Sequence, residues 1–420
     1  MQITNLINRL GFTPSSKILI KNFSYLSIMQ VFNLLLPLIT FPYLIRVLGK
    51  ETYGLVIYAQ AIISYLSIFI NFGFNISATK DIAINKENYE VISKIVSSVF
   101  LIKIFLFGIS IFVFSAIIYI IPNLRLNSDL YLLTMGYCIY ETLFPVWYFQ
   151  GKEEMKYITY INVLSRGTFT ILIFLLVKNR SDYLLVPILN TLGALIAGLS
   201  SIYLIFFKEK IKFSIPHINL LYQFVKDSAP FFFSRATGMI IAKSNTVLIG
   251  SFIGFTQVAY YDLAVKISEL CKVPSNLINQ TIYPRVSITK DMNFVIKVIK
   301  YNLILSVILY LSIIIFNGTI ISILGGTQMQ PAKYIIIVLN ITAPLAGISY
   351  FLGNTMLVVN GFYKPFNKSV IYEALLYILL AVLLIFFKIY NLYTFACIVI
   401  LSYSFEIIYR YYHIKKNRII

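Results

Sequence analysis

Long apolar segments alternate with short polar ones along almost the whole chain. Many apolar runs are about 18 residues or longer, and an α-helix needs about 20 residues to cross a hydrocarbon core about 30 Å thick. Strands of a membrane barrel would alternate in segments of roughly ten residues, so the pattern predicts helices. Gly, Pro, Asn and charged residues divide the runs into twelve predicted spans. The spans run approximately over Phe23–Leu48, Leu55–Asn75, Val91–Ile121, Leu130–Phe149, Tyr157–Val177, Tyr183–Phe207, Ala229–Ile253, Val258–Tyr283, Phe294–Leu324, Ala332–Asn360, Ser369–Phe387 and Leu392–Tyr412.

The composition supports a polytopic membrane protein of the all-α class. Hydrophobic residues make up 59% of the chain and charged residues 12%, whereas soluble domains carry about 25% charged residues. The first twenty residues are too polar to form the apolar core of a cleavable signal peptide. We therefore expect the first helix to direct insertion into the membrane.

The distribution of Lys and Arg predicts the orientation, because short cytoplasmic loops retain positive charge. Of the 35 basic residues, 22 fall on the side that holds both termini and the central loop, 7 fall on the other side, and 6 lie within spans. Both termini are therefore predicted to be cytoplasmic. The net charge of +19 needs no nucleic-acid partner, because basic loops face anionic lipid headgroups.

The chain also looks duplicated. A shift of 205 residues aligns Lys21 with Lys226, Gly49 with Gly254 and Ala59 with Ala264. Each half begins inside and holds six predicted spans, so we expect two parallel lobes related by a pseudo-twofold axis along the membrane normal. The predicted organisation is a lobe over residues 1–207, a cytoplasmic connection over 208–226 and a second lobe over 227–420.

Polar side chains form matching stripes on spans 2 and 8. Residues three, four and seven apart share one face of a helix. The 205-residue shift superposes Ser64 on Glu269, Asn71 on Asn276 and Asn75 on Gln280, which favours the duplication. The complete stripes are Gln60, Ser64, Ser67, Asn71 and Asn75 on span 2, and Asp262, Lys266, Glu269, Asn276 and Gln280 on span 8.

Charged side chains within the spans are the candidate functional residues, since a charge at mid-bilayer costs at least about 2.5 kcal/mol unless it faces protein or water. A cavity lined by cations attracts an anionic substrate. The predicted substrate-binding residues are Lys266, Arg235, Lys243, Lys103, Arg166, Gln60 and Asn71. The carboxylates predicted to couple transport to an ion gradient are Asp262, Glu269, Glu141, Glu373 and Glu406.

Structural explanations stay open for several of these residues. Asp262, Lys266 and Glu269 have the spacing of helix-neighbour ion pairs, and Lys103 and Arg166 can extend toward an interface. The other three carboxylates could carry a proton or balance a cation. Cys138, Cys271 and Cys397 lie alone in apolar helices and are interpreted as packing residues. No metal site or cofactor is predicted.

Several runs of residues resemble the O-antigen flippases, a branch of the superfamily that also contains multidrug exporters and the peptidoglycan-precursor flippase. The family position before Phe72 is often acidic, whereas here it is Asn71, and Lys266 matches a basic position of the family. The resemblance covers nearly the whole chain and is carried by residues 41–49, 53–54, 58–59, 72–75, 78–80, 147–155 (Trp-Tyr-Phe-Gln-Gly-Lys-Glu-Glu-Met), 260–261, 264–267 and 283–287.

This resemblance implies a flippase rather than an enzyme. Its substrate would be an oligosaccharide repeat unit on undecaprenyl pyrophosphate, moved from the cytoplasmic to the periplasmic leaflet of the bacterial inner membrane. A cavity between two lobes would shelter the headgroup and alternating access would move it, with an O-antigen polymerase and a chain-length regulator as candidate partners. The alternatives are a multidrug exporter of the same superfamily and, with a weaker case because the outer loops are short, an O-antigen polymerase or membrane glycosyltransferase.

Overall fold

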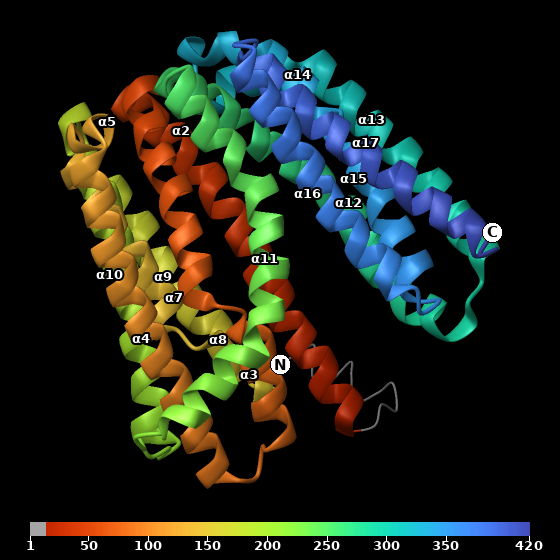
Figure 1. Ribbon diagram of the computed structural model, residues 1–420. Coiled ribbons are helices and arrows are strands. Elements are labelled where there is room, and N and C mark those ends of the chain that lie inside the picture. The colour runs from red at the N-terminus through yellow and green to blue at the C-terminus, as the bar shows by residue number, and fades with distance from the viewer. Residues whose placement is uncertain (1–13) are drawn as a thin grey trace. The chain divides into compact units, whose positions relative to one another are not determined.

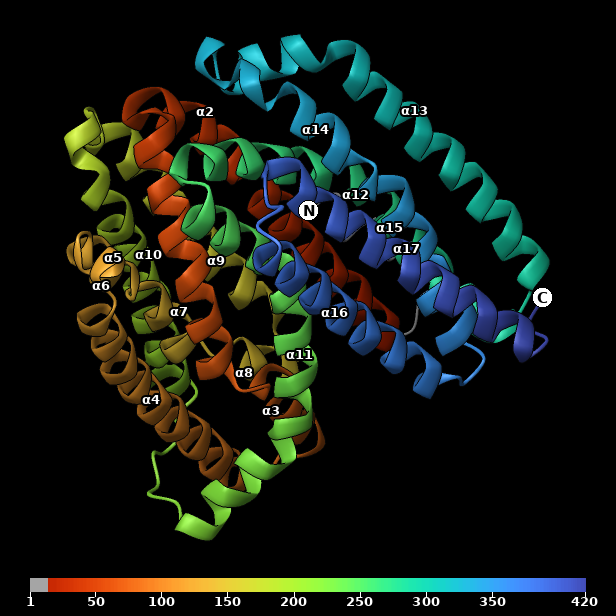
Figure 2. The same cartoon turned by 45° about the horizontal axis from the view of Figure 1, so that its top comes forward.

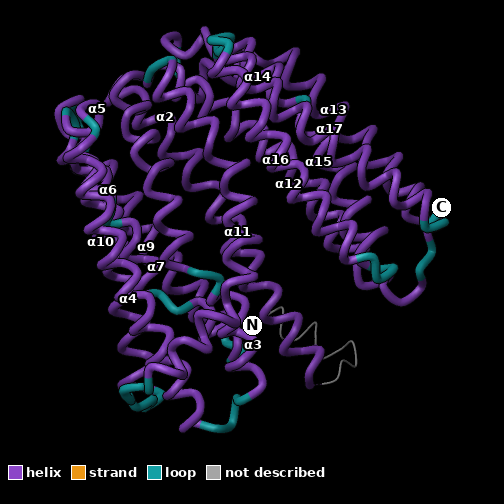
Figure 3. Tube along the Cα trace, in the orientation of Figure 1, coloured by secondary structure: helices purple, strands orange, loops and turns teal. Residues whose placement is uncertain are grey.

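The computed structural model describes residues 14–420, which form helices joined by turns and short loops and contain no strand (Figure 3). The first thirteen residues, including Arg9 and the predicted cytoplasmic N-terminus, lie outside the described residues. The described chain divides into two compact units. Unit 1 comprises residues 14–40 and Ile62–Ala236, and unit 2 comprises Phe41–Ala61 and Thr237–Ile420.

Eight helical stretches among the described residues are long and apolar enough to cross a membrane. One of them, Ser24–Ile84, covers two predicted spans, since the helix is interrupted at Gly49. The predicted spans 7 and 8 fall on two helices of 35 residues whose charged side chains make them less apolar. The predicted span 4 falls on three short helices. The difference from twelve therefore has three causes: a fused helix, polar helices and a broken helix.

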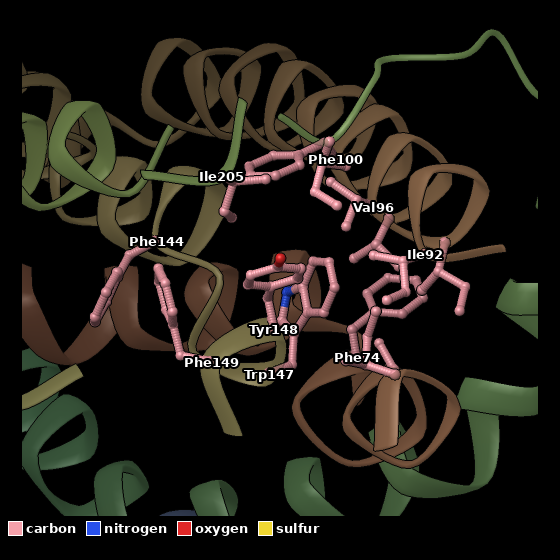
Figure 4. Close-up of a cluster of buried hydrophobic side chains, with 14 of the residues drawn as sticks. Phe74, Ile92, Val96, Phe100, Phe144, Trp147, Tyr148, Phe149 and Ile205 are labelled. Carbon is pink, nitrogen blue, oxygen red and sulfur yellow. The ribbon is translucent and has the colours of Figure 1, made fainter. Parts of the chain in front are cut away.

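Unit 1 packs around one aromatic core (Figure 4). Trp147, Tyr148 and Phe149 are buried and meet Phe74 and Phe100 in this cluster. The run of residues 147–155 that resembles the flippase family therefore builds the core of unit 1. The elements that lie wholly or partly in this unit are α2 (Pro14–Asn71), α3 (Phe74–Ile84), α4 (Tyr89–Ile120), α5 (Pro122–Arg125), α6 (Ser128–Thr134), α7 (Tyr137–Leu143), α8 (Val146–Gly151), α9 (Met155–Leu176), η1 (Arg180–Leu184), α10 (Leu185–Ile202), the π-helix η2 (Tyr203–Lys208) and α11 (Ile218–Phe252).

Unit 2 contains the long helices of the second half, in which α16 and α17 lie side by side (Figures 1 and 2). Its helix α12 packs against α14 and α15. Besides parts of α2 and α11, its elements are α12 (Phe255–Thr289), α13 (Met292–Leu324), η3 (Thr327–Ala332), α14 (Lys333–Asn340), α15 (Thr342–Tyr350), the π-helix η4 (Phe351–Val358), α16 (Tyr363–Phe386) and α17 (Leu392–Lys416).

Two glycines 205 residues apart break the helices at corresponding places. Gly49 has φ 75° and ψ 161°, and Gly254 has φ 130° and ψ 166°. Side chains with a Cβ rarely adopt these values, so glycine allows the chain to turn sharply between two long helices. We call residues 41–61, which contain Gly49 and pack with unit 2, the Gly49 hairpin.

Other helix breaks differ from the predicted spans. The predicted span 2 is interrupted at Phe72 (φ 45°) and Gly73 (φ 82°), whereas α12 continues without interruption through Thr289. The predicted span 10 is made of α14, α15 and η4. Apolar patterning indicates that a segment is buried in lipid, but it does not reveal such internal breaks.

The predicted central loop, residues 208–226, is folded against unit 1. Ile211 is buried within the core of unit 1, and the Ser214 N–H donates to Ser97 Oγ at 2.9 Å. Helix α11 already begins at Ile218, and Ser228 Oγ lies 2.6 Å from Ser77 Oγ. The first part of α11 runs at an angle to the rest (Figure 1), and Pro230 lies within it. The second half of the chain therefore begins as a part of unit 1.

Candidate functional site

Helix α12 carries the polar stripe that was predicted for span 8. Its exposure increases along the stripe: Asp262 and Lys266 are half-buried, whereas Glu269 and Gln280 are exposed. The opposite face is apolar and buried, with Leu263, Ala264 and Ile267 at most 2% exposed. The helix therefore packs one face within unit 2 and presents a charged face that solvent can reach.

Lys266 is held by a three-residue network at the Gly254 end of this stripe. Its ammonium forms an ion pair with Asp262, one turn earlier on α12, and lies 3.2 Å from Tyr53 Oη in the Gly49 hairpin. The Tyr53 hydroxyl donates to Asp262 Oδ2 at 2.6 Å. The same ammonium lies 5.3 Å from the ring centre of Phe41. The helix-neighbour pairing that the spacing allowed is therefore present, and an aromatic residue from another helix joins it.

Two more predicted residues lie near this network. Lys243 of α11 is exposed and interacts electrostatically with Asp262, Lys266 and Glu269. Glu269 pairs with Lys272, Nζ to Oε1 at 2.9 Å. The Lys272 ammonium lies 5.4 Å from the ring centre of Tyr403. The Lys272 side chain is buried while that of Glu269 is 58% exposed, so Lys272 is oriented inward and Glu269 remains accessible.

Three predicted residues from different helices meet inside unit 1. Asn71 Nδ2 donates to Glu141 Oε2 at 2.7 Å, and the buried Lys103 donates to the Glu141 backbone carbonyl at 2.7 Å. Asn71 and Lys103 are 3% and 1% exposed, whereas Glu141 is half-buried. Lys103 does not extend to an interface, because its ammonium finds an acceptor within the protein. The Lys103 ammonium also lies within electrostatic range of the Glu141 carboxylate.

The remaining predicted residues occupy separate places. Arg235 is exposed and lies within electrostatic range of Lys103. Arg166 is half-buried and interacts with the phenols of Tyr137 and Tyr140. Gln60 is half-buried on the Gly49 hairpin. Arg166, Arg235 and Lys103 lie in unit 1, and Lys243 and Lys266 lie in unit 2.

Glu373 and Glu406 form a third cluster inside unit 2, together with a residue that the sequence reasoning missed. Arg410, counted from the sequence among the basic residues of the cytoplasmic side, is 4% exposed and forms an ion pair with Glu406. Its guanidinium also donates to Ser349 Oγ at 2.7 Å and to Ser369 Oγ at 2.9 Å. Glu373 lies in the electrostatic range of both members of the pair. The spacing of four residues between Glu406 and Arg410 was the available signal.

The interpretation of one cysteine as a packing residue needs correction. Cys138 and Cys271 are buried as expected, but Cys397 is exposed.

At the end of unit 1 where α8 meets α9, Glu154 lies beside Glu209. Burial and this neighbouring carboxylate raise the pKa of Glu154, so its carboxyl group takes up a proton at higher pH than an exposed glutamate does.

Known proteins resemble this chain in sequence and in fold. A protein named "Putative O-antigen transporter" from Escherichia coli (strain K12) is 29% identical over 372 residues, which cover 86% of this chain and 88% of that protein. A multidrug resistance MATE family transporter of the MOP superfamily, in an inward-facing conformation, matches with a TM-score of 0.70 and 14% identity over 91% of this chain and 95% of that one. The lipid II flippase MurJ, in an inward closed conformation, matches with a TM-score of 0.69 and 19% identity over 93% of this chain and 87% of that one.

The two structural matches show a shared transporter fold, and the long apolar helices make the chain a multi-pass membrane protein. The model of the family described as "Polysaccharide biosynthesis protein" matches residues 19–290, which is well over half of the sequence. The matched region contains the aromatic core of unit 1, the Gly49 hairpin and the charged face of α12. The chain belongs to the polysaccharide biosynthesis protein family.

Proposed function

We propose that this protein flips a lipid-linked oligosaccharide across the bacterial inner membrane. The observation that carries the proposal is Lys266, a cation on a half-exposed face of a long helix within the family-matched region. Its ion pair with Asp262 leaves it 18% exposed, so an anion of higher charge can compete for it. The name of the Escherichia coli relative, an O-antigen transporter, and that of the lipid II flippase support the same substrate class.

The substrate in this proposal is undecaprenyl pyrophosphate carrying one repeat unit of a surface polysaccharide. Lys266 and Lys243 bind the pyrophosphate from unit 2, and Arg235, Arg166 and Lys103 contribute positive potential in unit 1. Gln60 and Asn71 were predicted to bind substrate as well. Since Asn71 is buried against Glu141, we assign it to holding that carboxylate and leave Gln60 as a ligand for sugar hydroxyls.

The movement in this proposal is alternating access by two six-helix lobes, residues 1–207 and 227–420, joined through residues 208–226. The positive phi angles at Gly49 and Gly254 support the repeat on which the lobes are based. Twelve spans follow when the fused Ser24–Ile84 stretch counts as two and α11, α12 and the broken α6–α8 segment count as three. Both termini are then cytoplasmic, as the distribution of Lys and Arg predicts.

Net transport requires a driving force, which we propose is a proton or sodium gradient sensed by carboxylates. Glu373 is the strongest candidate, because it is 5% exposed and lies beside the Glu406–Arg410 pair, where a second negative charge is costly. Glu141 has a comparable setting beside Lys103. Asp262 and Glu269 are each paired with a lysine on α12. An O-antigen polymerase and a chain-length regulator remain the proposed partners.

The test replaces the proposed anion-binding cations in living cells. We expect Lys266→Ala and Arg235→Ala to abolish surface polysaccharide, whereas Lys266→Arg retains a measurable amount because the positive charge remains. The readout is polysaccharide on a gel beside the amount of inserted protein in membranes. Normal polysaccharide in both alanine variants would reject the role of these cations. Export of cationic drugs with normal polysaccharide would instead favour the multidrug exporter.

A further inference from the structure

The Gly49 hairpin is attached to the helices of unit 2 by contacts that involve Lys266 and by contacts that do not. The contacts without Lys266 include a charged one, from Lys50 Nζ to Tyr260 Oη of α12 at 3.1 Å. Arg46 donates to the Ile323 carbonyl at 2.7 Å and Gln328 to the Ile45 carbonyl at 2.8 Å. Tyr58 Oη lies 2.9 Å from Ser251 Oγ. These contacts do not involve the charged face of α12.

The hairpin also packs closely through glycine. A Cβ on Gly54 would overlap the backbone carbonyl of Phe255, and a Cβ on Gly250 would overlap the ring of Tyr58. The helices therefore approach each other as tightly as their backbones permit. A side chain larger than glycine at either position would push the hairpin away from α11 or α12.

The remaining contacts are made by Lys266, the residue that we propose binds the anionic substrate. Lys266 touches the hairpin at three places: its ammonium lies 3.2 Å from Tyr53 Oη, 5.3 Å from the ring centre of Phe41 and 5.9 Å from the ring centre of Tyr53. Tyr53 and Phe41 are 3% and 1% exposed. Asp262 completes the network by accepting the Tyr53 hydroxyl at 2.6 Å. The same ammonium thus holds the hairpin and is the candidate ligand for the pyrophosphate.

We propose that binding of the substrate's pyrophosphate to Lys266 releases the Gly49 hairpin, with Tyr53 and Asp262 acting as positioning residues. This inference rests on the proposed function and adds the step that follows capture of the anion. A pyrophosphate carries more negative charge than one carboxylate, so it draws the Lys266 ammonium away from Asp262. The hairpin then loses all three contacts with this cation.

Asp262 also contributes to the release of the hairpin. Without Lys266 its half-buried carboxylate keeps the Tyr53 hydroxyl as a donor but loses its ion pair, which is unfavourable for a partly buried charge. Access to water stabilises that charge, and separation of Tyr53 from α12 provides it. The chain enters and leaves the hairpin through residues that pack with unit 1, at Thr40 and Ile62. After release, residues 41–61 are therefore connected only to unit 1, through the chain on either side of the hairpin.

The test measures accessibility of the hairpin in the purified full-length protein in nanodiscs. A cysteine is placed at Val56, which is 2% exposed, in a Cys397→Ser background, since Cys397 is the exposed native cysteine of the described residues. The probes are undecaprenyl pyrophosphate and, as the uncharged control, undecaprenol. We expect the pyrophosphate to raise the rate of maleimide labelling about tenfold, within the usual range of coupling between two sites, and undecaprenol to leave it unchanged.

Two tyrosine variants complete the design. Tyr53→Phe removes the hydroxyl that joins Lys266 and Asp262 and should label rapidly without pyrophosphate. Tyr58→Phe removes a neutral hairpin contact of similar size and should keep the response to pyrophosphate. Slow labelling of Tyr53→Phe, or wild-type labelling that ignores bound pyrophosphate, would overturn the release step. If Lys266→Ala still abolishes surface polysaccharide in that case, the proposed function stands without it; if Lys266→Ala transports normally, the proposed function itself is lost.

Discussion

The polar stripes of α2 and α12 occupy positions related by 205 residues, but the two halves of the chain use them differently. Asn71 on α2 is buried and donates to Glu141 within unit 1. Its counterpart Asn276 on α12 is half-exposed and accepts a hydrogen bond of 3.2 Å from Gln280 of the same helix. The α2 helix breaks directly after Asn71, at Phe72 and Gly73, whereas α12 continues for another thirteen residues beyond Asn276.

This difference separates polar residues that hold the fold from polar residues that are available to a substrate. Asn71 and Lys103 are buried, and both donate to Glu141 within unit 1. Glu406 and Arg410 are buried and form an ion pair in unit 2. Lys266, Lys243 and Glu269 retain exposure to solvent. An intramembrane charge is therefore a candidate for direct substrate binding where the structure leaves part of it accessible, whereas one whose partners are all internal does not meet the substrate directly.

The largest expected loss of stability comes from breaking the closed cluster of unit 2. Arg410→Ala leaves Glu406 and Glu373 buried without their cation, which should destabilise the protein by about 3–5 kcal/mol. Thermal unfolding of the purified protein measures the effect. The double variant Arg410→Met, Glu406→Leu removes both charges and should recover most of the loss. Equal destabilisation of single and double variants would show that the ion pair is not the cause.

A smaller effect distinguishes the two stripes directly. Asn71→Ala removes a buried side chain and leaves Glu141 Oε2 without its donor, so we expect a loss of about 1–3 kcal/mol. Asn276→Ala changes a half-exposed position and should stay within about 0.5 kcal/mol. Thermal unfolding of both variants, measured side by side, makes the comparison. Equal losses would mean that the two stripes do not differ in the way their contacts indicate.

The sequence predicted the features that depend on local pattern. The long apolar runs gave the helical membrane class, and the spacing of Asp262, Lys266 and Glu269 placed them on one face of α12. The distance of 205 residues identified Gly49 and Gly254 as corresponding turns. Even the alternative reading of Asp262 and Lys266 as an ion pair followed from their separation of four residues.

Features that depend on contacts between distant segments could not be predicted in this way. Nothing in the sequence around Tyr53 indicates that its hydroxyl reaches Asp262, which lies 209 residues further along the chain. Arg410 lies near a basic C-terminal segment and counts with the cytoplasmic cations in the sequence, although it is buried and donates to Ser349 and Ser369. The polar appearance of residues 208–226 concealed the packing of Ile211 in the core of unit 1.

The central claim is that Lys266 binds the anionic headgroup and does not serve merely to neutralise Asp262. The most direct measurement compares the affinity for undecaprenyl pyrophosphate of two variants in nanodiscs, Asp262→Ala and Asp262→Ala with Lys266→Ala. With Asp262 absent from both, Lys266 has no carboxylate partner from its ion pair to neutralise. We predict that adding Lys266→Ala weakens binding at least about tenfold, equivalent to about 1.4 kcal/mol. An unchanged affinity would contradict the claim.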